Sequence, residues 1–191
     1  MEQKEALELY RRTGAYLEGH FRLSSGLHSP GYMQSALVLQ HPADAASLGA
    51  GIAAYVESFR PTVVLSPALG GVIIGHEVAR ALAVRAIFAE RAGGTALTLR
   101  RGFTLTPADR VLVVEDVFTT GKLTRETMDV ARQTGADVVG AAAIVDRSGG
   151  TIDFGVPSYA LVSLAVPTYE PDKCPLCADG IPVVKPGSRP T

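Results

Sequence analysis

The chain has 191 residues, of which 47% are hydrophobic, enough to bury a core of ordinary size within one domain. Disordered and fibrous chains have quite different compositions. The formal net charge is −1, so composition gives no electrostatic argument for a nucleic-acid or membrane partner, because proteins that bind phosphate backbones usually carry a basic face.

The N-terminal segment MEQKEALELYRR is charged and helix-like, so we do not expect a secretory signal. No stretch approaches the roughly 20 uninterrupted apolar residues that span a bilayer. A cytoplasmic location follows by elimination. Cys174 and Cys177 stand together in the segment DKCPLCADG, which argues against a disulfide scaffold.

Short apolar runs and helical stretches alternate through the middle of the chain. The runs, which predict buried strands, are 62–65, 86–88, 111–114, 138–145 and 160–166. The helices predicted between several of them are 43–59, 71–82 and 123–134. This alternation predicts an α/β fold with a parallel sheet. Residues 91–106, rich in glycine and basic residues, predict a loop or short hairpin, and the proline-rich tail from Pro167 predicts an irregular segment that wraps over the domain.

The most informative segment is VLVVEDVFTTGKLT, residues 111–124. An apolar strand ends in Glu115 and Asp116, and a loop containing Thr119, Thr120 and Gly121 leads into a helix. Ligands of open α/β sheets bind beyond the carboxyl ends of the strands, and a helix N-terminus suits a phosphate group. The two carboxylates can accept hydrogen bonds from ribose hydroxyls and stabilise positive charge on the sugar. Alternatively, they cap the next turn and the loop is an ordinary one.

Competing phosphate motifs do not fit. A Walker A loop requires glycine where Asp116 stands, and the glycine spacing around Gly70 and Gly71 is wrong for a dinucleotide fingerprint.

Residues 111–124 resemble the signature of the type I phosphoribosyltransferases. The resemblance implies a doubly wound, mainly parallel sheet, a small hood over the active site, and Mg²⁺ accompanying the donor, phosphoribosyl pyrophosphate. It makes Glu115 and Asp116 the ribose-contacting pair. The donor-binding residues that follow are Val117, Phe118, Thr119, Thr120, Gly121, Lys122 and Leu123.

Three further segments resemble the orotate phosphoribosyltransferases. FRLSSGLHSPGY, residues 21–32, is similar to their hood motif, which implies orotate contacts from Ser24, Ser25, Gly26 and Thr119; the alternative is a plain turn. SPALGG, residues 66–71, stands in the place of the pyrophosphate loop and implies donor contacts from Gly70 and Gly71, although glycine pairs also mark tight strand–helix packing. IVDRSGG, residues 144–150, implies that Arg147 faces the base, the alternative being a surface ion pair.

The tail around Cys174 resembles a bacterial subgroup of the Thermus type. This chain departs from the usual pattern of the orotate enzymes in the positions of its basic residues. Ser24 and Gly70 stand where many orotate enzymes have basic residues, and the loop after Arg91 lacks the usual Lys and His. Arg100 and Arg101 are the candidates for replacing that charge.

The implied reaction joins orotate to the ribose and releases pyrophosphate, in pyrimidine biosynthesis. Glu115, Asp116 and Arg91 are the expected catalytic residues, and Mg²⁺ is expected to bind mainly through the donor, with no protein ligand assigned. The resemblance also implies a homodimer in which the 92–103 loop closes over the neighbouring site. Residues 1–42 and 167–191 would form the hood and 43–166 the core.

Two alternatives remain open: a purine or xanthine phosphoribosyltransferase, and a regulator that senses the donor without catalysis. Cys174 and Cys177 have the spacing of half a zinc site. Full coordination would need two more ligands, from histidines or from a second chain, so we expect an unliganded reduced pair. The histidines, which show no ligand spacing, are expected in surface or hydrogen-bonded roles; they are His20, His28, His41 and His76.

Overall fold

A computed structural model describes residues 1–23, 26–91, 93, 96–164 and 166–185. The elements in chain order are α1 (Gln3–Arg12), β1 (Tyr16–Arg22), β2 (His28–Met33), α2 (Ser35–Leu39), α3 (Pro42–Val56), η1 (Glu57–Phe59), β3 (Val63–Pro67), α4 (Gly70–Leu82), β4 (Arg85–Arg91), β5 (Leu97–Leu99), β6 (Arg110–Phe118), α5 (Lys122–Arg132), β7 (Asp137–Asp146), β8 (Ser158–Ser163), η2 (Pro171–Lys173) and α6 (Pro175–Ala178). The predicted strands and helices of the middle of the chain are confirmed, with ends that shift by a few residues.

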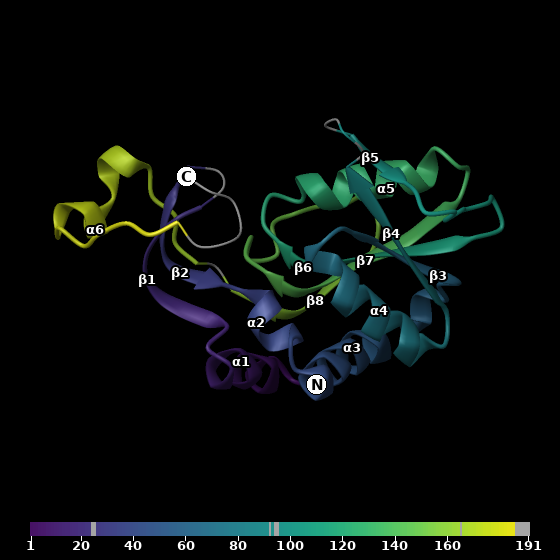
Figure 1. The fold of residues 1–191 in the computed structure, drawn as a ribbon, viewed down its shortest axis with the longest axis horizontal. Coiled ribbons are helices and arrows are strands. Elements are labelled where there is room, and N and C mark those ends of the chain that lie inside the picture. The colour runs from purple at the N-terminus through teal and green to yellow at the C-terminus, as the bar shows by residue number, and fades with distance from the viewer. Residues whose placement is uncertain (24–25, 92, 94–95, 165, 186–191) are drawn as a thin grey trace.

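The central sheet has six strands in the order β5-β4-β3-β6-β7-β8. All neighbours pair in parallel except β4 and β5, which are antiparallel. Helices lie on both of its faces, with α3 and α4 on one and α5 on the other (Figure 1). The predicted α/β fold with a mainly parallel, doubly wound sheet is therefore confirmed.

The continuous apolar strands follow from this double coverage. Along β3, Val64 packs in one core cluster with residues of α3 and α4, while its neighbours Val63 and Leu65 pack in a second cluster with residues of α5. Successive side chains of a strand point to opposite faces, so a strand buried on both faces needs apolar residues at every position. The absence of polar alternation in the sequence thus has a tertiary cause.

The strand order reverses between β3 and β6. Helix α4 follows β3 and helix α5 follows β6 on the opposite face, which leaves a crevice beyond the carboxyl ends of these two strands. Both the 66–71 segment and the 115–121 segment begin at this crevice.

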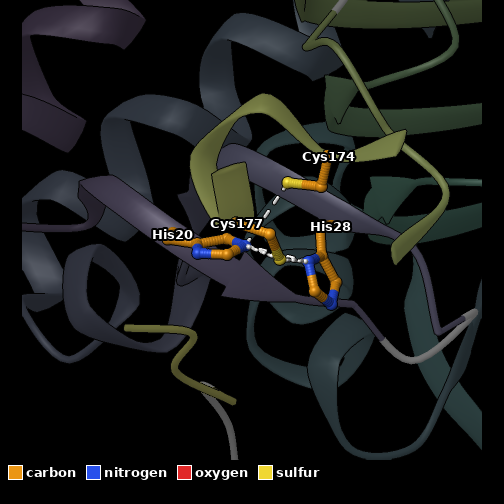
Figure 2. A group of neighbouring side chains, drawn as sticks. All are labelled: His20, His28, Cys174 and Cys177. Atoms are coloured by element: carbon orange, nitrogen blue, oxygen red, sulfur yellow. Dashed lines mark hydrogen bonds between the residues drawn. The ribbon is translucent and has the colours of Figure 1, made fainter. Parts of the chain in front are cut away.

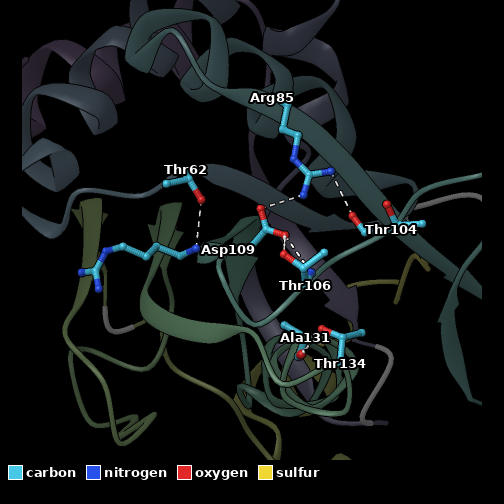
Figure 3. Close-up of polar contacts among 8 residues, drawn as sticks. Thr62, Arg85, Thr104, Thr106, Asp109, Ala131 and Thr134 are labelled. Atoms are coloured by element: carbon cyan, nitrogen blue, oxygen red, sulfur yellow. Dashed lines mark hydrogen bonds and ion pairs between the residues drawn. The ribbon is translucent and has the colours of Figure 1, made fainter.

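The predicted hairpin after Arg91 is confirmed by β5, which pairs antiparallel with the end of β4. The chain that returns toward β6 is held by Asp109 (Figure 3). Its carboxylate accepts hydrogen bonds from Arg85 at 2.8 Å and from the backbone N–H of Thr106 at 2.7 Å, and these contacts lower its pKa, the Arg85 bond being the main cause.

A separate two-stranded sheet, β1 and β2, lies beside the central sheet at the left of Figure 1, together with α6 and the tail. These two strands pair antiparallel, so the hood motif of residues 21–32 belongs to a hairpin. The tail forms isolated bridges to it, from Tyr169 to His28 and from Val184 to Phe21. Within the described residues, no helix combines the length and apolar character that crossing a membrane requires.

Candidate active site

Two adjacent carboxylates mark the end of β6. Glu115 is buried and accepts a short hydrogen bond from the Thr124 hydroxyl on α5. Burial raises its pKa to about 7; the bond from Thr124 opposes this rise and the neighbouring charge of Asp116 adds to it. Burial also raises the pKa of Asp116, against hydrogen bonds from Ser35 and the backbone.

The free energy of unfolding of the ligand-free protein should fall as the pH rises from about 4.5 to about 7. The pKa of Glu115 is raised from 4.5 to about 7 in the native state, so across this window the native protein binds more protons than the unfolded chain. At about 1.4 kcal/mol per pKa unit, this one group contributes at most about 3.5 kcal/mol. Denaturant titrations at a series of pH values measure the slope.

Glu115→Gln should reduce this slope. Asp116, whose pKa burial also raises, should account for a remaining part, and the exposed Glu8→Gln should leave the slope intact. Equal slopes in the wild type and in Glu115→Gln would contradict the assignment.

The second carboxylate lies against the glycine pair of the 66–71 segment. A Cβ atom at Gly70 would lie 2.7 Å from Asp116 Oδ1, and one at Gly71 would lie 2.8 Å from the Val114 carbonyl oxygen. The backbone oxygen cannot move away, so β6 requires glycine at position 71, whereas a side chain at position 70 would displace the carboxylate of Asp116. The structure thus brings together the predicted ribose pair and the predicted pyrophosphate loop.

A buried chain of hydrogen bonds connects Asp116 with α2 and α1. Tyr10 on α1 and Ser35 on α2 share a hydrogen bond of 2.9 Å, and Ser35 also bonds to Asp116. Desolvation raises the pKa of Tyr10, so it stays protonated. Sequence reasoning missed these residues, because the five-residue helix α2 is too short to show a periodic pattern.

The loop between β6 and α5 has the form expected of a phosphate site. Gly121 has a φ of +73°, and a Cβ atom there would lie 2.8 Å from Ile152 Cγ2. Thr119, Thr120 and Lys122 are exposed, beside the backbone N–H groups that begin α5. Of the other predicted donor contacts, Phe118 is buried against Phe154, with ring centroids 4.8 Å apart, and therefore offers only its backbone.

Arg125, which the sequence did not single out, holds this loop in place. Its Nη1 donates to the Thr120 carbonyl oxygen at 3.2 Å and its Nη2 to the Asp153 carbonyl oxygen at 2.7 Å. Its guanidinium also lies 5.3 Å from the ring centre of Phe154. A basic residue one turn into the helix would have been the only signal for it.

Arg147 follows β7 and faces the hood strand β2. Its Nη2 lies 3.4 Å from both the Ser29 hydroxyl and the Gly31 carbonyl oxygen, and its buried Nε finds no partner among the described residues. Desolvation lowers its pKa. Burial raises the pKa of Tyr32; the charge of Asp116 adds to this rise and that of Arg147 opposes it. Arg147 is thus a poorly satisfied cation, and the ion pair that was the alternative for it is absent from the described residues.

The hood residues are only partly described. Ser24 and Ser25 lie outside the described residues. Gly26 has a φ of +89° in the turn between β1 and β2. Ser29 is buried and donates to the Pro167 carbonyl oxygen at 3.1 Å, so it ties the hood to the tail.

The basic residues around the β4–β5 hairpin are paired. Arg91 lies 2.7 Å from Glu126 on α5. Arg101 makes two bonds to Glu90, of 2.9 and 3.0 Å, and Arg100 lies 3.9 Å from the same carboxylate. Glu90 offsets only one of the two positive charges of Arg100 and Arg101, and both arginines are exposed, so they stay candidates for replacing the missing Lys and His.

Comparisons with known proteins agree on one family. No protein-family model matches the chain. The orotate phosphoribosyltransferase of Pelotomaculum thermopropionicum is 52% identical over 189 residues, 99% of each chain. One from Thermus thermophilus is 50% identical over 179 residues, 94% of this chain and 98% of its own length. The crystal structure of Mycobacterium tuberculosis H37Rv orotate phosphoribosyltransferase in complex with Fe(III) dicitrate superposes with a TM-score of 0.72 at 26% identity, covering 85% of this chain and 96% of that one.

Proposed function

Because this chain belongs to the orotate phosphoribosyltransferase family, we propose that the crevice between β3 and β6 is where it transfers the phosphoribosyl group of phosphoribosyl pyrophosphate to orotate. The products are orotidine 5′-phosphate and pyrophosphate. One observation supports this placement above the others: the carboxylate of Asp116, the Gly70–Gly71 turn and the loop before α5 meet at the point where the strand order reverses.

The donor fits this crevice in one orientation. Its 5-phosphate would take the loop of Thr119–Gly121, where hydroxyls and free N–H groups at the start of α5 favour an anion. Its ribose hydroxyls would then reach Glu115 and Asp116, and its pyrophosphate would lie along Gly70 and Gly71, where the absence of side chains permits close backbone contact.

The chemical step breaks the bond between ribose C1 and the pyrophosphate oxygen, which keeps the electron pair. N1 of orotate bonds to C1, and its proton passes to the departing pyrophosphate. In between, the sugar carries positive charge, which the carboxylate of Asp116 stabilises at close range in a crevice of low dielectric. Glu115, bonded to Thr124, positions the ribose.

Arg147 is the proposed orotate-binding residue. The half-buried guanidinium makes only long hydrogen bonds, so it can donate two parallel charge-assisted bonds to a carboxylate. Thr119, Gly26, Ser24 and Ser25 complete the proposed orotate contacts.

Mg²⁺ is the proposed cofactor. It binds few carboxylates and prefers to share substrate phosphate oxygens, and Asp116, beside the proposed pyrophosphate loop, is a donor of the right kind. When bound, Mg²⁺ neutralises charge on the departing pyrophosphate.

We further propose a cytoplasmic homodimer in which the hood is residues 1–42 with 167–191, the core is 43–166, and Arg91 serves the neighbouring subunit's site. Arg91 is exposed at the end of β4 and, among the described residues, is held only by its pair with Glu126, itself partly exposed. Such a pair costs little to break, so Arg91 can leave it for a pyrophosphate.

A mixing experiment tests this arrangement through the loss of orotate's ultraviolet absorbance. The wild type should consume orotate with Mg²⁺ and the donor, should stop on chelation, and should leave purine bases unchanged. Arg91→Ala and Asp116→Asn should each be nearly inactive. Refolded together, half of the dimers are mixed and each has one site free of substitutions, so about a quarter of the wild-type activity should return.

Glu115→Gln mixed with Asp116→Asn is the matched control. In any one site, Glu115 and Asp116 belong to the same subunit. Each site of a mixed dimer therefore carries one of the two substitutions, and no activity should return. Failure of the Arg91→Ala mixture to recover would place Arg91 in its own subunit's site or outside the reaction. Turnover of a purine in place of orotate would contradict the acceptor.

A further inference from the structure

Four potential metal ligands from distant parts of the chain converge in the hood. His20 and His28, from β1 and β2, meet Cys174 and Cys177, from the tail, with their ligand atoms all within 4.8 Å of one another (Figure 2). Three of the four side chains are buried, and both cysteines are free thiols. The sequence expectation of an unliganded reduced pair rested on the lack of two further ligands. The fold supplies them.

The local structure explains how the four converge. Arg22 pairs with His28 across the hairpin, so His20, two residues earlier on the same face, is a diagonal neighbour of His28. Cys174 caps the N-terminus of α6 and Cys177 follows one turn later, so both sulfurs lie on one side of the helix. In Figure 2 the sulfur of Cys177 lies between the two imidazole rings and the sulfur of Cys174 lies above them.

Four of the six distances between the ligand atoms are close to those of a tetrahedral zinc site, and all six are within 4.8 Å. Such a site separates its sulfur and nitrogen ligands by about 3.6 Å and its two nitrogens by about 3.3 Å. His20 Nε2 lies 3.5 Å from the sulfur of Cys174 and 3.7 Å from that of Cys177, and His28 Nδ1 lies 3.3 Å from Cys177 Sγ. The two ring nitrogens, 2.8 Å apart, would need to separate by only about 0.5 Å.

The tautomer of His20 favours a cation over a hydrogen-bonded network. Its Nδ1 lies 2.7 Å from the Ile181 carbonyl oxygen and must donate there, so Nε2 carries a lone pair. That single lone pair faces His28 Nδ1 and two thiols at once. Hydrogen bonding can satisfy only one of these three groups through it, whereas a metal ion takes one lone pair from each ligand. A backbone carbonyl on the other ring nitrogen is also the usual outer partner of a metal-bound histidine.

The tail buries too little hydrophobic surface to be held in place by packing. Between Val166 and Lys185, Cys174 is the only buried residue among those described, so hydrophobic burial cannot offset the entropy lost in ordering this segment. Backbone bonds join the tail to the hairpin on either side of α6, at Tyr169 and at Val184. A metal ion between them would close the tail onto the hairpin, as metals do in small units with little core.

We propose that His20, His28, Cys174 and Cys177 form a structural zinc site that fastens the C-terminal tail to the β1–β2 hairpin. Two thiolates and two imidazoles in tetrahedral order suit Zn²⁺ better than oxygen-seeking cations. All four positions are protein ligands, which leaves none open for water or substrate and assigns the ion a structural role.

The site also bears on the proposed orotate pocket, and this consequence rests on the proposed function. The residues between Arg22 and His28, which include Gly26 and the predicted orotate contacts Ser24 and Ser25, connect the strands of His20 and His28 in sequence. Zinc would therefore fix both ends of that segment. Its loss should raise the KM for orotate more than the KM for the donor.

The first test is the zinc content of the untagged, full-length protein, measured by atomic emission. We expect one zinc ion per chain in the wild type and in His76→Gln, a matched control because His76 is an exposed histidine outside the cluster. The doubly substituted Cys174→Ser, Cys177→Ser protein should lose the ion, and His28→Gln should retain much less. Zinc retained at full occupancy without both thiols would overturn the proposal.

A second test avoids dependence on variants that fold poorly. Wild-type protein stripped of metal and loaded with Co²⁺ should show the sulfur-to-cobalt charge-transfer band and the intense visible bands of tetrahedral thiolate coordination. Binding should release protons from the two thiols, and trypsin cleavage after Lys173 should slow at least tenfold on metal loading.

Other outcomes would refute the zinc site. If the protein bound neither Zn²⁺ nor Co²⁺ stoichiometrically, the four side chains would be a hydrogen-bonded cluster. If freshly purified protein contained a Cys174–Cys177 disulfide, the two cysteines would be a redox pair. A normal zinc content combined with unchanged KM for orotate on metal removal would overturn only the consequence for the orotate pocket, and would leave the fastening of the tail intact.

Discussion

Asp116→Asn is expected to lower kcat about 10²- to 10³-fold, the usual effect of removing one group that stabilises transition-state charge. The amide has nearly the shape of the carboxylate, so the contact with Gly70 and the hydrogen bond with Ser35 can remain. What disappears is the negative charge that faces the sugar when the bond to pyrophosphate breaks.

The same substitution should leave stability unchanged or slightly improved. Burial raises the pKa of Asp116, which means that the fold disfavours its charged form. At neutral pH a neutral amide avoids that desolvation cost. Steady-state kinetics measures the expected fall in kcat, and thermal unfolding measures the expected unchanged or slightly higher stability.

Asp129→Asn is the matched control, because Asp129 is an exposed aspartate on α5 that pairs only with Arg132 among the described residues. It should change neither quantity. An Asp116→Asn protein with kcat within about threefold of the wild type would remove Asp116 from the catalytic step.

Arg147→Met is expected to raise the KM for orotate by about 10²-fold or more, with little change in the KM for the donor. Truncating one partner of a buried, hydrogen-bonded charge pair typically costs about 2–5 kcal/mol. The guanidinium is already held in a half-buried position with two long contacts at 3.4 Å, so orotate would supply the acceptors that it lacks. Steady-state kinetics with each substrate varied in turn separates the two constants.

Two companion variants sharpen this test. Arg147→Lys keeps the charge but loses the planar fork, so it should recover only part of the affinity. Arg132→Met, at the exposed end of α5, should behave as the wild type. If Arg147→Met raised both KM values equally, Arg147 would be supporting the loop beyond β7 rather than binding orotate.

The sequence alone determined the local units of this protein. Short apolar runs such as 111–114 predict strands from local sequence. Glu115, Asp116 and Gly121 follow that run within a few residues, so the backbone alone keeps them near its end. Strand, carboxylate pair, phosphate loop and helix are contiguous, so their relative positions depend little on the rest of the fold. The resemblance to a known signature could therefore identify them.

Only the tertiary structure decided which distant groups meet. Asp116 faces Gly70 because β3 and β6 are neighbours in the sheet, and Ser35 reaches the same carboxylate from a helix too short to predict. His20 joins Cys174 because the tail pairs with the β1–β2 hairpin. Contacts between residues far apart in sequence depend on strand order and on the docking of elements, which no local pattern encodes; the paired cysteines therefore looked unliganded until the chain was folded.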